Sequence, residues 1–251
     1  MTDTVLTARE DGILTVTMNR PEALNAFVPE MLEALTAALE GAAREEGTRV
    51  VVLRGAGRAF SAGVDLKVLR TDGVAAGHVP ERFDRAGIAV ARAMRGCPKP
   101  VIARVHGACF TGALELALMA DMILATADGK LGDTHARFGL RPSWGMSQTL
   151  PDAVGLRRAR ELSYTGRTFT GAEAARWGLA NEAVPDETTL DALVAERAGA
   201  IAANSPGAVA AYKDLYGLAA ERRPLAEAVE EEVRRRYDID DTAERLAAFK
   251  R

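Results

Sequence analysis

The sequence has few of the residues that mark disulfide-rich or metal-binding proteins. Its 251 residues include only two cysteines, Cys97 and Cys109. Two thiols cannot form the multiple disulfides of small secreted domains, and the spacing of this pair matches no metal-ligand motif. We therefore expect two buried, reduced thiols, no bound metal and a cytoplasmic protein.

Long apolar runs and an excess of positive charge are missing as well. No apolar segment approaches the ~20 residues that cross a bilayer. The N-terminal stretch MTDTVLTARED has no basic start followed by an apolar core, so we expect no signal peptide. The formal net charge of −3 differs from the clustered cationic excess of nucleic-acid-binding surfaces. We therefore expect neither a membrane span nor a nucleic-acid partner.

The first three fifths of the chain carry an α/β pattern. Alternating or continuously apolar segments predict five strands, at 5–9, 13–18, 50–53, 101–105 and 122–125. Apolar residues at helical spacing predict helices between them, at 28–42, 80–95 and 112–120. Strands and helices that alternate in this way favour an α/β fold with right-handed crossovers.

From about residue 151 the pattern becomes mainly helical. It predicts one short strand at 180–184 and helices at 156–164, 171–177, 190–203, 206–220 and 225–237. No segment of disordered composition separates the two parts. We place the α/β core at residues 1–190 and a C-terminal helical region at residues 191–251.

Glu115 is the only charge within the apolar stretch FTGALELALMA. A helix that is apolar on every side is buried, so we expect its carboxyl group to be buried, with a raised pKa or a charged partner. Gly112, three residues earlier, lies on the same helix face, where the first N–H groups have no intrahelical acceptor. An oxyanion donor and a proton-transfer group within one turn indicate an active site. The alternative is a structural glutamate paired with a distant arginine.

Four ordered segments resemble the crotonase superfamily, the enoyl-CoA hydratase/isomerase family. They are MNRPEALNAF, GRAFSAGVDLK, KPVIARVHGACFTGALELALMADMILA and the stretch from GLRPSWGMSQ to LANEAVP. The resemblance implies a crotonase-like (ClpP/crotonase) spiral of ββα units, with C-terminal helices that assemble trimers or hexamers. It also implies an acyl-CoA thioester as the substrate, so that coenzyme A arrives with the substrate and no separate cofactor is needed.

The resemblance also assigns roles to residues. The backbone N–H groups of Val64 and Gly112 match the family's oxyanion hole, which stabilises an enolate formed at the thioester. Glu115 matches the first of the hydratases' two catalytic glutamates. The positions that match contacts with coenzyme A are Ala23, Leu24, Ala26, Ala62, Phe249 and Lys250.

The chain departs from the family at the second glutamate. Where the hydratases have G-x-P-E, this sequence has Gly132-Asp133-Thr134-His135. An imidazole can give or take a proton near neutral pH, so Glu115 and His135 form a plausible acid/base pair. Trp144 stands in a loop that is usually rich in glycine, and we expect it to narrow the acyl pocket.

The leading hypothesis is an enoyl-CoA hydratase or a closely related lyase. In a first alternative, His135 only bonds to a neighbouring backbone group and Glu115 alone moves protons, as an isomerase would require. In a second, the protein binds acyl-CoA without turnover. Among the other polar groups, we expect His106 to be a buried side chain with satisfied hydrogen bonds.

Overall fold

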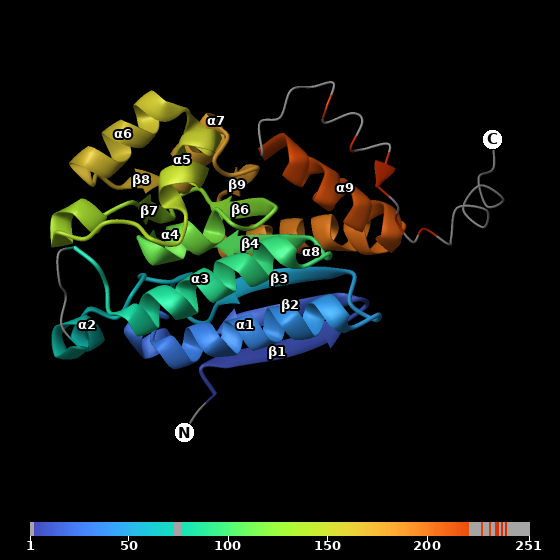
Figure 1. Cartoon of the computed structure of the whole chain (residues 1–251), viewed down its shortest axis with the longest axis horizontal. Helices are drawn as coiled ribbons and strands as arrows, with labels where there is room; N and C mark the ends of the chain where they lie inside the picture. The colour runs from blue at the N-terminus through green and yellow to red at the C-terminus, as the bar shows by residue number, and fades with distance from the viewer. Residues whose placement is uncertain are drawn as a thin grey trace.

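A six-stranded sheet forms the centre of the molecule (Figure 1). The computed structural model describes residues 3–72 and 77–220, together with residues 227, 231, 234, 235, 237 and 239. In spatial order the strands are β1 (Val5–Glu10), β2 (Ile13–Met18), β3 (Val50–Gly55), β4 (Val101–Val105), β6 (Met122–Thr126) and β9 (Glu182–Val184). β1 and β2 pair antiparallel, and every later neighbour in the sheet is parallel.

A second, smaller sheet has three strands. It consists of β5 (Ala108–Phe110), β7 (Lys130–Gly132) and β8 (Phe169–Thr170), with β7 parallel to β5 and antiparallel to β8. In the chain, β5 follows β4 closely and β7 follows β6. Short connections therefore lead from the large sheet into the small one. The segments that leave the second sheet therefore lie side by side.

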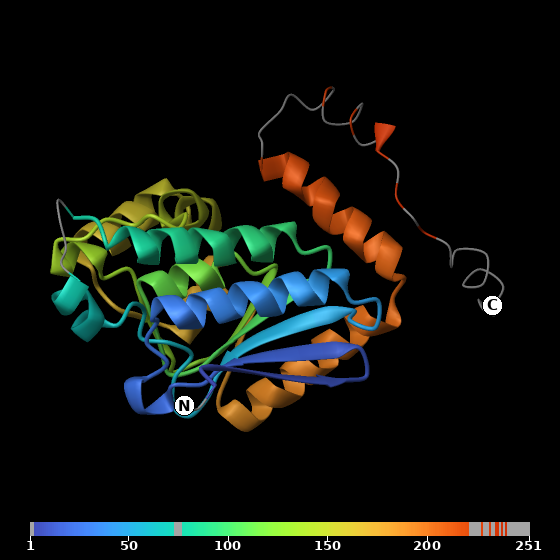
Figure 2. The same cartoon turned by 60° about the horizontal axis from the view of Figure 1, so that its bottom comes forward.

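Helices cover both faces of the large sheet (Figure 2). α1 (Pro29–Arg44) and α3 (Glu81–Gly96) lie on one face, where their apolar residues join the main hydrophobic core. α8 (Glu187–Ala203) covers the opposite face and packs on β3, β4 and β6 through a second cluster that includes Leu190, Leu193 and Val194. This two-sided cover explains the continuously apolar sequences of the central strands.

Shorter helices complete the described fold. They are α2 (Leu66–Asp72), α4 (Gly112–Ala117), α5 (Met146–Val154), α6 (Leu156–Thr165), α7 (Gly171–Trp177) and α9 (Pro206–Ala220), with 3-10 turns η1 (Pro21–Ala23) and η2 (His135–Phe138). In the described part of the chain, none of the helices has the length and apolar character that crossing a membrane requires.

The sequence-based α/β prediction is confirmed, with local corrections. All five predicted strands of the first part form. The helix predicted at 112–120 ends at Ala117, and the strand predicted at 180–184 begins at Glu182. The predicted boundary after residue 190 falls inside α8, and most of the helix predicted at 225–237 lies outside the described residues.

The buried end of β4 carries polar groups. The His106 ring contacts the Gly57 carbonyl oxygen at 2.8 Å and Arg104 at 2.8 Å, so the prediction that His106 is buried and hydrogen-bonded is confirmed. Arg104, which is also buried, forms ion pairs with Asp191 at 2.6 Å and Glu187 at 3.2 Å. These contacts attach α8 to the sheet.

Candidate active site

Two loops are joined next to the first predicted oxyanion donor. Backbone bonds run from Ala62 N–H to the Leu24 carbonyl and from Phe27 N–H to the Gly63 carbonyl, at 2.9 and 2.8 Å. The buried side chain of Asn25 fixes the same junction, because its amide donates to the carbonyls of Ala56 and Ala59 at 2.8 Å each. This bonding holds the backbone of the neighbouring Val64 in one position.

The second predicted donor follows a strained residue. Thr111 has φ 47° and ψ −116°, a conformation that is unfavourable for a β-branched side chain. Its side chain makes no cap bond to α4. Within residues 3–72 and 77–220, the N–H groups of Val64 and Gly112 have no hydrogen-bond acceptor. Both donors are therefore available to a ligand.

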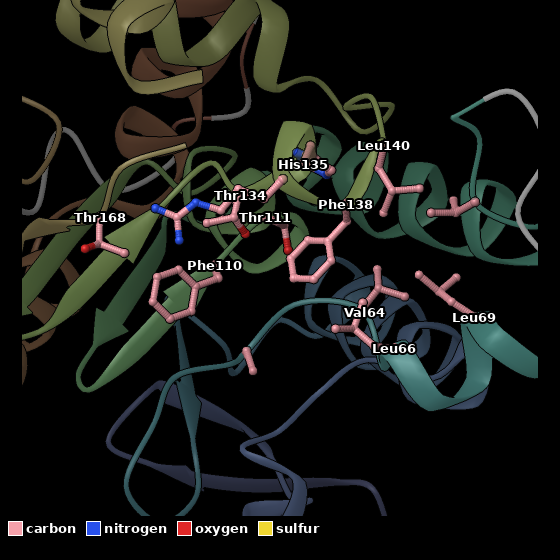
Figure 3. A pocket seen from close by; sticks show the side chains of 13 residues that line it. Val64, Leu66, Leu69, Phe110, Thr111, Thr134, His135, Phe138, Leu140 and Thr168 are labelled. Atoms are coloured by element: carbon pink, nitrogen blue, oxygen red, sulfur yellow. The ribbon is translucent and has the colours of Figure 1, made fainter. Parts of the chain in front are cut away.

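Val64 and Thr111, the residue before Gly112, line a cavity of about 260 Å³ (Figure 3). In Figure 3, Leu66, Leu69 and Leu140 lie at one end, and Phe110 and Thr168 lie at the other. His135 and Thr111 lie between the two ends. The cavity thus has an apolar end formed by leucines, and the polar groups of His135 and Thr111 lie near its middle.

Glu115 is buried as the sequence predicts, with 1% of its surface exposed. Its Oε1 accepts hydrogen bonds from the backbone N–H groups of Trp144, at 2.9 Å, and Met146, at 3.1 Å. Burial raises the pKa of the Glu115 carboxyl, although His135 and the two N–H donors act in the opposite direction. A raised pKa lets this carboxyl hold a proton for transfer.

His135 faces Glu115 across the site. Its Nε2 lies 3.6 Å from Oε2 of Glu115, and its Nδ1 lies 2.7 Å from Oδ1 of Asp133. The hydroxyl of Ser163 donates to the other oxygen of Asp133 at 2.6 Å. Burial alone would raise the pKa of Asp133, but the hydrogen bonds from His135 and Ser163 outweigh it, and the pKa is lowered. Asp133 is therefore a carboxylate that accepts both bonds.

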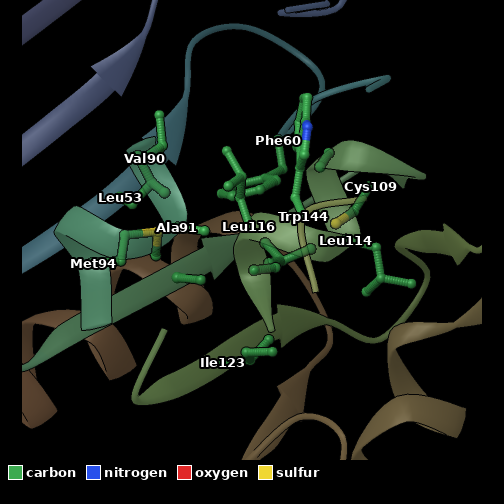
Figure 4. Close-up of a cluster of buried hydrophobic side chains, with 14 of the residues drawn as sticks. Leu53, Phe60, Val90, Ala91, Met94, Cys109, Leu114, Leu116, Ile123 and Trp144 are labelled. Atoms are coloured by element: carbon green, nitrogen blue, oxygen red, sulfur yellow. The ribbon is translucent and has the colours of Figure 1, made fainter. Parts of the chain in front are cut away.

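The position of Trp144 corrects the sequence-based prediction. Trp144 is 4% exposed and belongs to the hydrophobic core that also contains Leu114, Leu116 and Phe60 (Figure 4). The ring fits there because glycines leave space for it: a Cβ on Gly87 would lie 2.0 Å from the ring and one on Gly112 2.6 Å from it. Trp144 contributes to the site through its backbone N–H and through its cover over Gly112.

The residues predicted to contact coenzyme A fall into three groups. Ala62 lines the cavity itself. Ala23, Leu24 and Ala26 lie in the loop that is bonded to it. Phe249 and Lys250 are outside the described residues.

Several residues of the site were missed by the sequence reasoning. Leu66, Leu69, Val79 and Leu140 line the cavity, and Ser163 supports Asp133 from α6. Apolar residues at the start of a helix or in a loop carry no signal that separates a ligand cavity from a core. In the described part of the chain, no three His, Cys, Asp or Glu side chains are grouped so that they could hold a metal ion.

The family model described as enoyl-CoA hydratase/isomerase matches residues 8–250. The chain belongs to the enoyl-CoA hydratase/isomerase family. A relative from Arabidopsis thaliana, named a probable peroxisomal enoyl-CoA hydratase, is 35% identical over 204 residues, which cover 81% of this chain and 74% of that protein. The mevalonyl-coenzyme A hydratase of Beauveria bassiana is 37% identical over 82% of this chain and 76% of its own.

Solved structures of this family share the fold. An enoyl-CoA hydratase/carnithine racemase from Magnetospirillum magneticum superposes with a TM-score of 0.88 at 33% identity, covering 99% of this chain and 93% of its own. An enoyl-CoA hydratase from Bacillus anthracis gives a TM-score of 0.86 at 31% identity, covering 98% and 96%. The predicted crotonase-like fold is confirmed.

Proposed function

We propose that the protein hydrates an enoyl-CoA thioester, with Glu115 and His135 as the acid/base pair. The observation that carries this proposal is the 3.6 Å approach of His135 Nε2 to Glu115 Oε2, because His135 lines a cavity together with Val64 and with Thr111, the residue before Gly112. The names of the hydratase relatives support the same reaction class.

The first step forms an enolate. His135 takes a proton from water at Nε2, and the hydroxide oxygen bonds to Cβ of the substrate. The electrons of the C=C bond move toward the thioester, whose oxygen becomes negative. The N–H groups of Val64 and Gly112 hold this oxygen, and each such donor contributes on the order of 3 kcal/mol to the transition state.

The second step completes the addition of water. Glu115 gives its proton to Cα, and the enolate collapses to the saturated 3-hydroxyacyl thioester. His135 is then protonated and Glu115 ionised. Because Nε2 and Oε2 lie 3.6 Å apart, a proton moving from the ring to the carboxylate restores the starting state. The reaction uses no cofactor beyond the coenzyme A of the substrate.

The apolar end of the cavity is suited to the acyl group. We assign this role to Leu66, Leu69 and Leu140, which line that end, and withdraw it from Trp144.

We also propose that the protein is cytoplasmic and assembles as a trimer or hexamer. The exposed tyrosines Tyr212 and Tyr216 on α9 support assembly, and light scattering after size exclusion tests it.

The experiment is the loss of conjugated-thioester absorbance when purified protein meets crotonyl-CoA. Wild-type protein should turn over, and Glu115→Gln and His135→Ala should each lose about 100-fold or more in kcat while binding coenzyme A. Tyr164→Phe, at an exposed site on α6, is the matched control and should be unchanged. Full turnover in His135→Ala would refute its catalytic role, and double-bond migration without hydration would favour an isomerase. Binding without turnover on a panel of enoyl-CoA esters would favour the non-catalytic alternative.

A further inference from the structure

Asp133 is a buried carboxylate whose two oxygens have different partners. Oδ1 accepts from Nδ1 of His135 at 2.7 Å and from the His135 backbone N–H at 3.3 Å. Oδ2 accepts from the Ser163 hydroxyl at 2.6 Å. Asp133 is 2% exposed, so these protein contacts replace contacts of its side chain with water. Hydrogen bonds therefore hold both carboxylate oxygens of Asp133 in place.

The contact with Nδ1 decides where the proton of the neutral imidazole lies. A carboxylate only accepts hydrogen bonds, so Nδ1 must be the protonated nitrogen. The lone pair of the ring is then on Nε2, the atom that faces Glu115 at 3.6 Å. The opposite tautomer would place two acceptors, Nδ1 and Oδ1, against each other at 2.7 Å.

We propose that Asp133 is a positioning residue that fixes the Nδ1–H tautomer of His135, and that Ser163 in turn holds Asp133 in place. The inference rests on the proposed acid/base role of His135. With this tautomer the ring can take a proton at Nε2 without first turning or exchanging its own proton. This is the arrangement that a histidine needs in order to replace a carboxylate as a base at this position.

A purely structural role for Asp133 fits the contacts less well. Considering only described residues, His135 is its one ion-pair partner, and no lysine or arginine side chain lies within ion-pair distance. Asp133 follows β7, and Ser163 belongs to the separate helix α6. The segment after β7 and the helix α6 therefore meet at the Asp133 carboxylate. Its other side-chain contact is with the imidazole of His135, which lines the cavity.

The first test uses wild-type protein labelled with ¹⁵N-histidine. The chain has only three histidines, and His135→Ala identifies the signals of His135. We expect the neutral ring to show a pyrrole-type Nδ1 and a pyridine-type Nε2 in spectra recorded from pH 6 to 9. A ring with the proton on Nε2 would overturn the proposal without any need for a variant to fold.

Variants of the two supporting residues give the second test. In Asp133→Asn the side-chain amide can donate to Nδ1, so we expect the proton to shift to Nε2. We expect kcat on crotonyl-CoA to fall about 100-fold or more, with KM changed little, because an imidazole in the wrong tautomer cannot act as the base. Ser163→Ala keeps the contact with Nδ1 and should retain the tautomer, with a loss in kcat of about tenfold or less.

The outcomes separate this inference from the proposed function. If His135→Ala retains turnover, the acid/base role of His135 fails, whatever the tautomer. If His135→Ala is inactive but Asp133→Asn keeps both turnover and the Nδ1–H signal, only the positioning role of Asp133 fails. If Asp133→Asn does not fold, the wild-type spectra still test the inference, because a neutral ring with its proton on Nε2 overturns it.

Discussion

Replacing Glu115 by glutamine should stabilise the protein at neutral pH although it removes activity. Glu115 is 1% exposed, and burial raises the pKa of its carboxyl group because the ionised form loses its hydration. A glutamine has nearly the same shape and keeps a carbonyl oxygen for the N–H groups of Trp144 and Met146, at 2.9 and 3.1 Å. The substitution therefore removes the cost of burying a charge, or of taking up a proton on folding, and preserves the hydrogen bonds.

The gain should depend on pH in a defined direction. The folded protein binds the Glu115 proton more tightly than the unfolded chain does. Its stability therefore falls as pH rises from the pKa of an exposed glutamate, about 4.3, toward the raised value of the folded state. Glu115→Gln lacks this loss. Below the ordinary pKa of glutamate, residue 115 is uncharged in the wild type and in the variant, whether the chain is folded or unfolded. This contribution to the difference in stability then disappears.

Stabilising single substitutions commonly contribute about 0.5–2 kcal/mol to the free energy of unfolding, and we expect a gain of this order. For a chain of 251 residues, each kcal/mol raises the Tm by about 2–4 °C. Calorimetry at pH 8 and pH 5 measures the change, and we expect a larger increase in Tm at pH 8. Glu115→Ala is the control: it leaves the two backbone N–H groups buried without an acceptor and should destabilise the protein by about 2–5 kcal/mol. A glutamine variant that is less stable than the wild type at pH 8 would refute the argument.

Three further predictions concern the surroundings of the site. Gly112→Ala would place a Cβ 2.6 Å from the Trp144 ring, so we expect a loss of about 1–3 kcal/mol in urea unfolding, largely recovered when Trp144→Leu is added. Thr111→Gly relieves a φ of 47°, worth about 1–3 kcal/mol, against a cost of about 0.5–1 kcal/mol for glycine, so the Tm should rise; a lower Tm would contradict the strain. Burial raises the pKa of the Cys109 thiol far above its usual range, so Cys109 should react with a thiol reagent only on unfolding, and rapid labelling of the native protein would show otherwise.

The longer helices and strands were predictable because the burial of apolar side chains produces both the sequence pattern and the structure. The apolar stretch around Glu115 predicts a buried helix, and the carboxyl group is buried as expected. The alternation of β2 matches its buried residues Leu14, Val16 and Met18. The short strands β5, β7 and β8 have only two or three residues each, too few for any periodicity to be visible. These three strands form because the packing of the whole fold brings their segments side by side.

Side-chain direction was less predictable than secondary structure. The sequence places Trp144 in the loop of the active site correctly, yet its ring turns into the core. The cause lies in Gly87 and Gly112, which belong to α3 and α4 and leave the space that the ring fills. Ser163 was missed for a similar reason: it is 30 residues from Asp133, and only the packing of α6 brings the two together.

In the proposed reaction, the histidine in place of the family's second glutamate changes how protons are distributed in the site. In that reaction, Glu115 and His135 share one transferable proton, either on the carboxyl or on Nε2, while the hydrogen bonds from Nδ1 and Ser163 lower the pKa of Asp133. The two arrangements have the same total charge and differ by one transfer across 3.6 Å. A proton that leaves Glu115 for the substrate can therefore be replaced from His135 without exchange with bulk water. For this reason the carboxylate at position 133 matters as much to the proposed reaction as the histidine itself: without Asp133, nothing in the described site would keep the lone pair of the ring directed at Glu115.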